Sequence, residues 1–299
     1  PLSRRRGGEP TPPTSGRGYG NPLLRNVMRT LMTDSPTPFD ELLVSREGPV
    51  LTLALNRPKR RNALSRSLVN ALRDAIEAAA RDGETRAVVI RGEGPTLCAG
   101  GDISEYAHAP DGEGAREDGR ALRALLVAMV ESPLPIVGRA HGGIYGGGIG
   151  LLSACDIVVA AETATFSLSE ARLGIVPAVI SPFIVAAIGA REARARMLRA
   201  ALFDAETALR IGLAHELATE DALDATVAAV VADLLKGAPG AIAVAKRIPT
   251  MVAETPGHAI ERVSVDLFAE RVTSDEGREG LRAFLEKRPP AWAAEGQDA

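Results

Sequence analysis

The sequence predicts an α/β protein with a largely parallel central sheet and an all-helical C-terminal region. Short apolar runs at residues 87–90, 136–137 and 157–160 are bounded by charged residues or glycines. This pattern is typical of strands that are buried on both faces. Helical or glycine-rich segments separate the runs, and strands that alternate with helices form crossover units of a parallel sheet. After about residue 213 the strand pattern ends, so the rest of the chain is expected to be helical.

The first structured elements are expected to be a β-hairpin and a helix. Residues 41–45 and 50–55 have the pattern of strands, and Glu47-Gly48 provides the turn between them. Residues 64–80 then place apolar side chains at helical spacing, with Ser65 as the candidate N-cap. The last third of the chain predicts four further helices, at residues 222–236, 241–252, 258–272 and 275–287.

Composition divides the chain into three parts. Residues 1–37 contain six arginines against two acidic residues, so this Pro- and Gly-rich tail is expected to be disordered, with a natural start near Met28 or Met32. Its charge of +4 leaves −7 for the rest of a chain whose net charge is −3. We expect a core at residues 38–217 and a helical region at 218–299, whose apolar faces would pack on the core or on another subunit.

Charge and cysteine content exclude several classes of protein. A net charge of −3 over 299 residues offers no polycationic surface, so nucleic acid is not expected as a partner. Cys98 and Cys155 form no CxxC pair, which argues against a disulfide scaffold or a thiolate zinc site and favours a reducing, cytoplasmic setting. No apolar run approaches the ~20 residues of a membrane helix, so no membrane span is expected.

Two glycine-rich loops are the candidate functional segments, at residues 92–103 and 141–150. Each follows a predicted buried strand. Glycine allows a bound group to approach main-chain N–H groups, and the second loop leads into a helical pattern whose N-terminus is electropositive. The loops are therefore either tight turns or two halves of one anion-binding site.

Several known motifs are absent from the sequence. Neither loop contains the dinucleotide-binding motif GxGxxG. No glycine is followed by the Gly-Lys-Ser/Thr of a P-loop, and no GxSxG nucleophile elbow occurs. The four histidines show no metal-ligand spacing, so no metal site is expected. They are His108, His141, His215 and His258.

Four segments carry a resemblance to a known family. They are Leu55-Asn56-Arg57-Pro58 with Arg61-Asn62-Ala63-Leu64, Cys98-Ala99-Gly100-Gly101-Asp102-Ile103, Gly146-Gly147-Gly148 before Ala154-Cys155-Asp156, and Phe166-Ser167-Leu168-Ser169-Glu170 with Leu173-Gly174-Ile175-Val176-Pro177. In order and spacing they resemble the crotonase, or enoyl-CoA hydratase/isomerase, superfamily from about residue 40 to 293. The resemblance implies a crotonase-like fold, with repeated ββα units and a C-terminal helical oligomerisation region.

The resemblance also implies a reaction on an acyl-CoA thioester that needs no cofactor. Gly101 and Gly147 match the two backbone N–H groups that hold the thioester oxygen. Fixed donors of this kind stabilise an enolate oxyanion by roughly 3 kcal/mol each. Glu170 matches the catalytic glutamate that moves a proton to or from the acyl chain. Its apolar neighbours would raise its pKa if the side chain is buried.

Further positions match the family's CoA-binding segments. Arg57 and Arg61 lie along the pantetheine and nucleotide in that pattern, although each could equally be a solvated loop charge. Phe268 and Lys287 match C-terminal positions that help to bind the nucleotide end, often from a neighbouring subunit, and Phe268 could equally be helix core. A homotrimer or a dimer of trimers is implied. The remaining binding positions flank the two glycine loops and are Ala63, Ala99, Gly100, Asp102, Ile103 and Gly146.

Two aspartates and the two cysteines are expected to have structural roles. Asp102, although counted among the binding positions, is expected together with Asp156 to fix a turn beside the site, because aspartate accepts hydrogen bonds from nearby backbone N–H groups. Cys98 and Cys155 are expected to be small buried residues.

One position departs from the family pattern. Many hydratases of the family have a second glutamate three residues after the oxyanion glycine, and this chain has Gly150 there. A single glutamate is compatible with hydration, with enoyl-CoA isomerisation, or with a catalytically silent acyl-CoA-binding subunit. Residues 169–182 resemble the methylglutaconyl-CoA hydratase-like branch, which favours hydration of a branched 2-enoyl-CoA.

Polar support for the attacking water would then come from other residues. Ser169, Glu105 and His108 are the candidates in the sequence. Residues 104–118 combine Pro and Gly with alternating charges, which predicts a mobile loop able to act as a lid.

Overall fold

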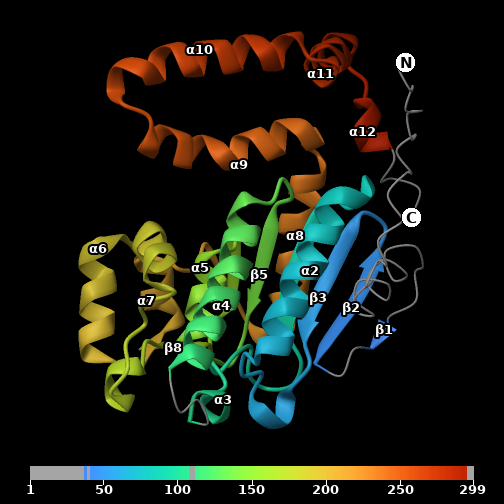
Figure 1. Ribbon diagram of the computed structural model, residues 1–299. Coiled ribbons are helices and arrows are strands. Elements are labelled where there is room, and N and C mark those ends of the chain that lie inside the picture. The colour runs from blue at the N-terminus through green and yellow to red at the C-terminus, as the bar shows by residue number, and fades with distance from the viewer. Residues whose placement is uncertain (1–36, 39–40, 108–111, 295–299) are drawn as a thin grey trace, which may run out of the picture.

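The computed structural model describes residues 37–38, 41–107 and 112–294 of the chain. The predicted disordered tail therefore lies outside the described residues, except for Thr37. A large sheet forms the centre (Figure 1). In spatial order its strands are β1 (Thr37–Pro38), β2 (Leu42–Glu47), β3 (Val50–Leu55), β4 (Ala87–Gly92), β5 (Ile136–Ala140), β7 (Ile157–Ala161) and β10 (Glu216–Ala218).

The predicted hairpin and parallel sheet are both confirmed. Strands β2 and β3 pair in antiparallel fashion, while β3, β4, β5, β7 and β10 are all parallel to one another. Branched apolar side chains fill these strands, since Leu53, Ile90 and Val137 are completely buried. Such strands need helices on both faces.

The expectation that strands end near residue 213 is wrong. Strand β10 pairs with β7 at the edge of the large sheet. It has only three residues, and Glu216 at its start is exposed. So short a strand gives no apolar run in the sequence. Its backbone pairs with the free edge of β7, and this pairing does not depend on its side chains.

A second sheet lies across the ends of these strands and repeats the ββα pattern. It contains β6 (Gly143–Tyr145), β8 (Thr165–Ser167) and β9 (Phe203–Asp204). Strands β5 and β6 lead into α5 (Gly147–Ser153), and β7 and β8 lead into α6 (Ser181–Arg199). The shorter helices are η1 (Pro58–Arg60), η2 (Glu170–Leu173), α7 (Ala205–Arg210) and η3 (Glu220–Ala222).

Helices cover both faces of the large sheet. Helix α2 (Arg66–Asp82) packs beside α4 (Glu113–Glu131) on one face, and α8 (Leu223–Leu235) packs on β5 and β7 from the other (Figure 1). The predicted N-cap of α2 is confirmed, because the Ser65 hydroxyl accepts a hydrogen bond from the Leu68 N–H. The predicted C-terminal helices are confirmed as well. After α8 they are α9 (Pro239–Glu254), α10 (Gly257–Thr273), α11 (Asp275–Glu286) and the short α12 (Ala291–Ala294).

The segment predicted as a mobile loop is largely helical. Residues 103–107 form α3 (Ile103–Ala107), and α4 begins at Glu113. Arg66 donates to the Gly114 carbonyl and to the Glu117 and Asp118 carboxylates, which ties the first two turns of α4 to α2. These long-range ion pairs offset the weak local helical signal, whereas the candidate His108 lies outside the described residues.

Within the described ranges, no single helix is both long and apolar enough to cross a bilayer. One bent pair, Glu220–Leu235 with Pro239–Glu254, has the required length and composition, but its two halves meet at 105°.

Candidate active site

The fold brings the two glycine-rich loops together. Residues 97–101 lie between Leu64 and β6, because Leu64 forms a parallel bridge with Gly101 and Cys98 forms one with Ile144. The Tyr145 N–H donates to the Cys98 carbonyl at 3.0 Å. The first loop therefore extends the second sheet, and its end reaches the start of α5.

This arrangement leaves two backbone amides adjacent and free. The Gly100 carbonyl and the Asp102 N–H bond with Leu64, so the intervening Gly101 N–H faces the other way. Gly147 is the first residue of α5, where an N–H has no partner inside the helix. Neither N–H donates to another residue in the part of the chain that the structure describes. A Cβ built on Gly147 would lie 3.4 Å from the Gly101 nitrogen, so the two amides form one site.

Glycine is required where the loops meet. Gly146, the N-cap of α5, has φ of 47°, and Gly100 has φ of 99°, both in the region that favours glycine. A Cβ on Gly100 would lie 3.0 Å from the Tyr145 carbonyl oxygen. The predicted positions Gly100 and Gly146 thus allow the close approach that places the free amides of Gly101 and Gly147.

Glu170 lies against the same helix start. It begins η2 just after β8, and a Cβ on Gly146 would be 2.9 Å from its Oε1 atom. Its Oε2 atom is buried without a hydrogen-bond partner among the described residues. Burial raises the pKa of this carboxyl above its ordinary value. A carboxyl of this kind is suited to accepting and returning a proton at a substrate bound to the two amides.

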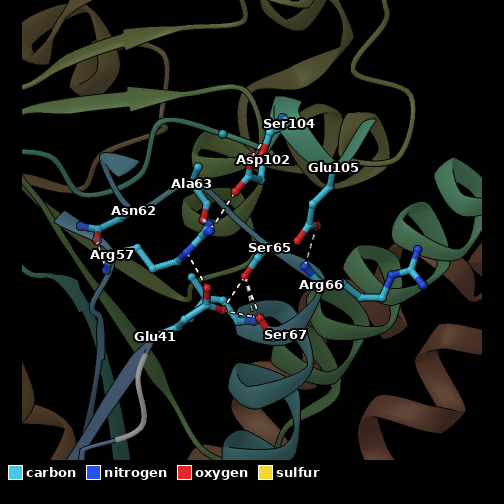
Figure 2. Close-up of polar contacts among 12 residues, drawn as sticks. Glu41, Arg57, Asn62, Ala63, Ser65, Arg66, Ser67, Asp102, Ser104 and Glu105 are labelled. Atoms are coloured by element: carbon cyan, nitrogen blue, oxygen red, sulfur yellow. Dashed lines mark hydrogen bonds and ion pairs between the residues drawn. The ribbon is translucent and has the colours of Figure 1, made fainter. Parts of the chain in front are cut away.

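Arg57 supports the first loop from within the chain (Figure 2). Its guanidinium pairs with Glu41 at 2.7 Å and with Asp102 at 2.9 Å, and it also donates to the Ala63 carbonyl. The Arg57 side chain is only 14% exposed. These contacts hold Arg57 and the Ala63 carbonyl in the scaffold of the site, and their expected contact with CoA stays a prediction. Glu41 was not found by sequence reasoning, since nothing local marks it.

Asn62 is a second scaffold residue that sequence reasoning gave no role. It is fully buried with φ of 54°, and its amide donates to the carbonyls of Glu93 and Thr96. Its Oδ1 accepts a hydrogen bond from the Arg57 N–H at 2.8 Å. A signal was present, because asparagine tolerates the left-handed region better than other non-glycine residues.

Asp102 has the turn-fixing role that the sequence predicts. Its carboxylate accepts hydrogen bonds from the Ser104 N–H and hydroxyl, which together with Arg57 hold the pKa of Asp102 below its ordinary range. Asp156 likewise accepts from the Ile136 N–H at 2.7 Å. Cys98 is fully buried and Cys155 partly buried, and both are free thiols.

Other expected binding residues surround the amide pair. The Ala99 N–H donates to the Arg61 carbonyl, which holds the two predicted segments together, and the Arg61 side chain is exposed. Ile103 is 57% exposed at the start of α3. Arg61 and Ile103 are therefore accessible to a ligand, whereas the Ala99 amide is already bonded.

Two expected binding residues lie far from the site in the same chain. Phe268 is on α10 and Lys287 follows α11, and Figure 1 shows these helices at the opposite end of the sheet from α3. Phe268 is 70% exposed, so the helix-core alternative does not describe it within one chain. Within one chain these two residues therefore do not reach the glycine loops.

Glu105 and Ser169, two candidates for supporting the attacking water, have different surroundings. The Glu105 carboxylate accepts from the Arg66 N–H at 3.0 Å and so caps the start of α2 instead (Figure 2). Ser169 precedes Glu170 as the N-cap of η2, and its side chain makes no capping hydrogen bond. Of the three candidates, Ser169 is the one that the structure places beside Glu170.

Comparison with known proteins agrees with this geometry. A family model described as enoyl-CoA hydratase/isomerase matches residues 45–295. The chain is 33% identical over 256 residues to 2,3-dehydroadipyl-CoA hydratase of Escherichia coli, which covers 84% of this chain and 98% of that protein. It is 32% identical over 255 residues to mitochondrial methylglutaconyl-CoA hydratase of Mus musculus, which covers 82% of this chain and 80% of that protein.

Solved structures are similar over the same region. AtuE of Pseudomonas aeruginosa has a TM-score of 0.81 at 39% identity, and the match covers 85% of this chain and 99% of that one. An enoyl-CoA hydratase of Mycobacterium smegmatis has a TM-score of 0.81 at 29% identity, with 86% and 99% covered. With its crotonase-like fold, paired amides and buried glutamate, and with a family match that spans most of its length, the chain belongs to the enoyl-CoA hydratase/isomerase family.

Proposed function

We propose that this protein is a lyase that adds water to a 2-enoyl-CoA thioester without a cofactor. The observation that carries the proposal is the position of the Glu170 carboxyl, at the start of α5, beside two free backbone amides. The thioester oxygen would accept hydrogen bonds from Gly101 and Gly147, and α5 would add its electropositive end.

One carboxylate can perform the whole addition. Ionised Glu170 takes a proton from water while the water oxygen bonds to C3, and the electron pair of the double bond moves to the thioester oxygen. The amide pair stabilises this enolate. Glu170 then returns the proton to C2, the carbonyl re-forms, and the product is a 3-hydroxyacyl-CoA. The atoms of one water are thus added and the enzyme is unchanged.

We propose a branched acyl chain as the substrate. Methylglutaconyl-CoA hydratase is among the relatives of this chain, and residues 169–182 have the pattern of that branch. Aliphatic side chains also follow Glu170 at the surface, where Leu173, Ile175 and Val176 are all exposed. Such a surface suits a branched hydrocarbon at the reacting end of the chain.

We also propose that the working form is a homotrimer or a dimer of trimers. Phe268 and Lys287 would then reach the nucleotide end of an acyl-CoA that is bound to the next subunit. Supporting this, α10 and α11 leave Phe268, Phe284 and Leu285 between 70% and 82% exposed.

An isomerase of the same fold is the second candidate. It is favoured by a single observation, the presence of Gly150 where a second carboxylate would assist hydration. Glu170 would then carry a proton between two carbons of one substrate. A silent acyl-CoA-binding subunit is the third possibility, and it requires that Glu170 do no chemistry.

Mass-resolved turnover separates these functions. We would assay 3-methylglutaconyl-CoA, crotonyl-CoA and a 3-enoyl-CoA with the purified protein and with Glu170→Gln. Hydration predicts a product heavier by one water, formed about 10²–10⁴-fold more slowly by the variant. An unchanged mass with a shifted double bond would establish an isomerase, and binding without any turnover would leave the silent subunit.

A further inference from the structure

Gly150 and Ile180 make an unusually close contact beside the active site. Gly150 lies in α5, and Ile180 is the N-cap of α6 with only 3% of its surface exposed. A Cβ built on Gly150 would lie 2.4 Å from Cγ2 of Ile180 and 2.8 Å from its Cβ. Both distances are shorter than atoms in contact allow, so any larger residue at position 150 requires Ile180 to move.

This contact is one helical turn from the carboxyl of Glu170. Glu170 approaches α5 at Gly146, and Ile180 approaches it four residues later, which is about 6 Å along the helix axis. An acyl chain that ran from the amide pair along α5 would pass the carboxyl and then the isoleucine. At the second position the helix has no side chain of its own, and Ile180 fills the space beside it.

We infer that Ile180 determines substrate specificity, because it takes the space that a side chain at position 150 would need and gives the acyl site an aliphatic wall there. This wall excludes a second carboxylate, and it matches an alkyl branch on the reacting carbon. The inference rests on the proposed hydration and names the residue that selects a branched 2-enoyl-CoA over an unbranched one.

The selectivity of turnover between a branched and an unbranched substrate tests the role of Ile180. The ratio of kcat/KM for 3-methylcrotonyl-CoA to that for crotonyl-CoA is expected to fall about tenfold in Ile180→Ala, since one methyl contact in an apolar pocket is worth roughly this factor. Ile188→Ala removes the same atoms from a buried position two turns along α6 and is the control, expected to leave the ratio unchanged. An unchanged ratio in Ile180→Ala, or an equal change in both variants, would overturn the inference.

Thermal unfolding tests the packing without any substrate. Gly150→Ala is expected to lower Tm in the natural chain and to be tolerated in Ile180→Gly, where both clashing atoms are gone. Additive effects of the two changes on Tm would refute the contact whatever the turnover shows. Wild-type protein that hydrates neither substrate would instead overturn the proposed function, and the specificity role of Ile180 with it.

Discussion

Glu170 carries the chemistry of the proposed reaction through its burial. Its carboxyl lies against Gly146 at the start of α5, and burial raises the pKa of this carboxyl. A general base works best when its pKa is near the working pH, and an exposed glutamate at about 4.3 is a weaker base than this one. The position of one carboxyl therefore links folding to catalysis.

Replacing this carboxyl is expected to stabilise the protein while it abolishes turnover. The raised pKa means that the folded state favours the neutral acid, so wild-type stability falls as pH rises through about 4.3 towards the folded-state pKa. Glu170→Gln removes this cost. Its Tm should exceed that of wild type at pH 7 and match it at pH 3.5, by calorimetry. Glu162→Gln at an exposed site is the control. Equal Tm differences at both pH values would contradict burial of the charged form.

Wild-type activity should follow the same ionisation. Because Glu170 must be ionised to take a proton from water, kcat/KM is expected to fall on acidification at a higher pH than an ordinary glutamate would give. A profile of kcat/KM from pH 4 to 9 would measure it. A midpoint at or below 4.3 would show that the free enzyme does not bury this carboxyl.

Gly146 is expected to tolerate no side chain. A Cβ there would lie 2.9 Å from Oε1 of Glu170, and φ of 47° adds a strain of about 1 kcal/mol for any other residue. Gly146→Ala should lower kcat at least tenfold by displacing the carboxyl. Gly83→Ala is the matched control, because Gly83 has φ of 74° and open space around it. An equal fall in kcat in the two variants would mean that backbone strain, and not displacement of the carboxyl, causes the loss.

Among the elements, α9 is held to the core by one buried lysine. The Lys246 ammonium pairs with Asp156 at 2.8 Å and donates to the carbonyls of Met129 and Leu134. Its side chain is 7% exposed. Burial raises the pKa of Asp156 and Lys246 opposes that rise, so the two groups depend on each other. This contact joins the end of α4 and the start of β7 to the C-terminal region.

Removal of this ammonium should loosen the C-terminal helices. Lys246→Met would leave a buried carboxylate and two carbonyls without their donor, at an expected cost of about 3 kcal/mol in the free energy of unfolding. Denaturant unfolding would measure the loss, and limited proteolysis should cut first within α9–α12. Lys236→Met, at an exposed surface pair with Asp233, should change stability by less than about 1 kcal/mol. A loss no larger than in that control would show that α9 is held by other contacts.

For the molecule as a whole, α11 leaves large apolar side chains exposed to water. Phe284 and Leu285 are 82% and 79% exposed in one chain. Water contact over such a patch is unfavourable, and a second copy of the chain would relieve it. The proposed homotrimer or dimer of trimers would have this effect and would also bring Phe268 towards a neighbouring site.

Charge on this surface should therefore break the assembly. Phe284→Asp is expected to reduce the mass measured by light scattering to that of one chain, with unchanged circular dichroism and a raised KM for the CoA ester. Arg282→Asp introduces the same carboxylate at an exposed residue of α11 one half-turn away and serves as the control. A wild-type protein with the mass of a single chain would refute the proposed oligomer.

Local sequence signals predicted most of the elements and the catalytic candidates. The hairpin, the strands β4, β5 and β7, the N-cap Ser65 and the C-terminal helices follow from apolar spacing and capping chemistry, which act over a few residues. Gly101, Gly147 and Glu170 were recognised from their motifs. The sequence therefore determined the fold class and the types of group at the site.

Long-range contacts decided what local patterns do not contain. Residues 101 and 147 meet because the first loop pairs with β6, and Arg57 pairs with Glu41 and Asp102. Strand β10 pairs with the edge of β7, Arg66 binds the first two turns of α4, and Ile180 fills the space beside Gly150. Each outcome depends on partners that are distant in the chain, so only the tertiary structure determined it.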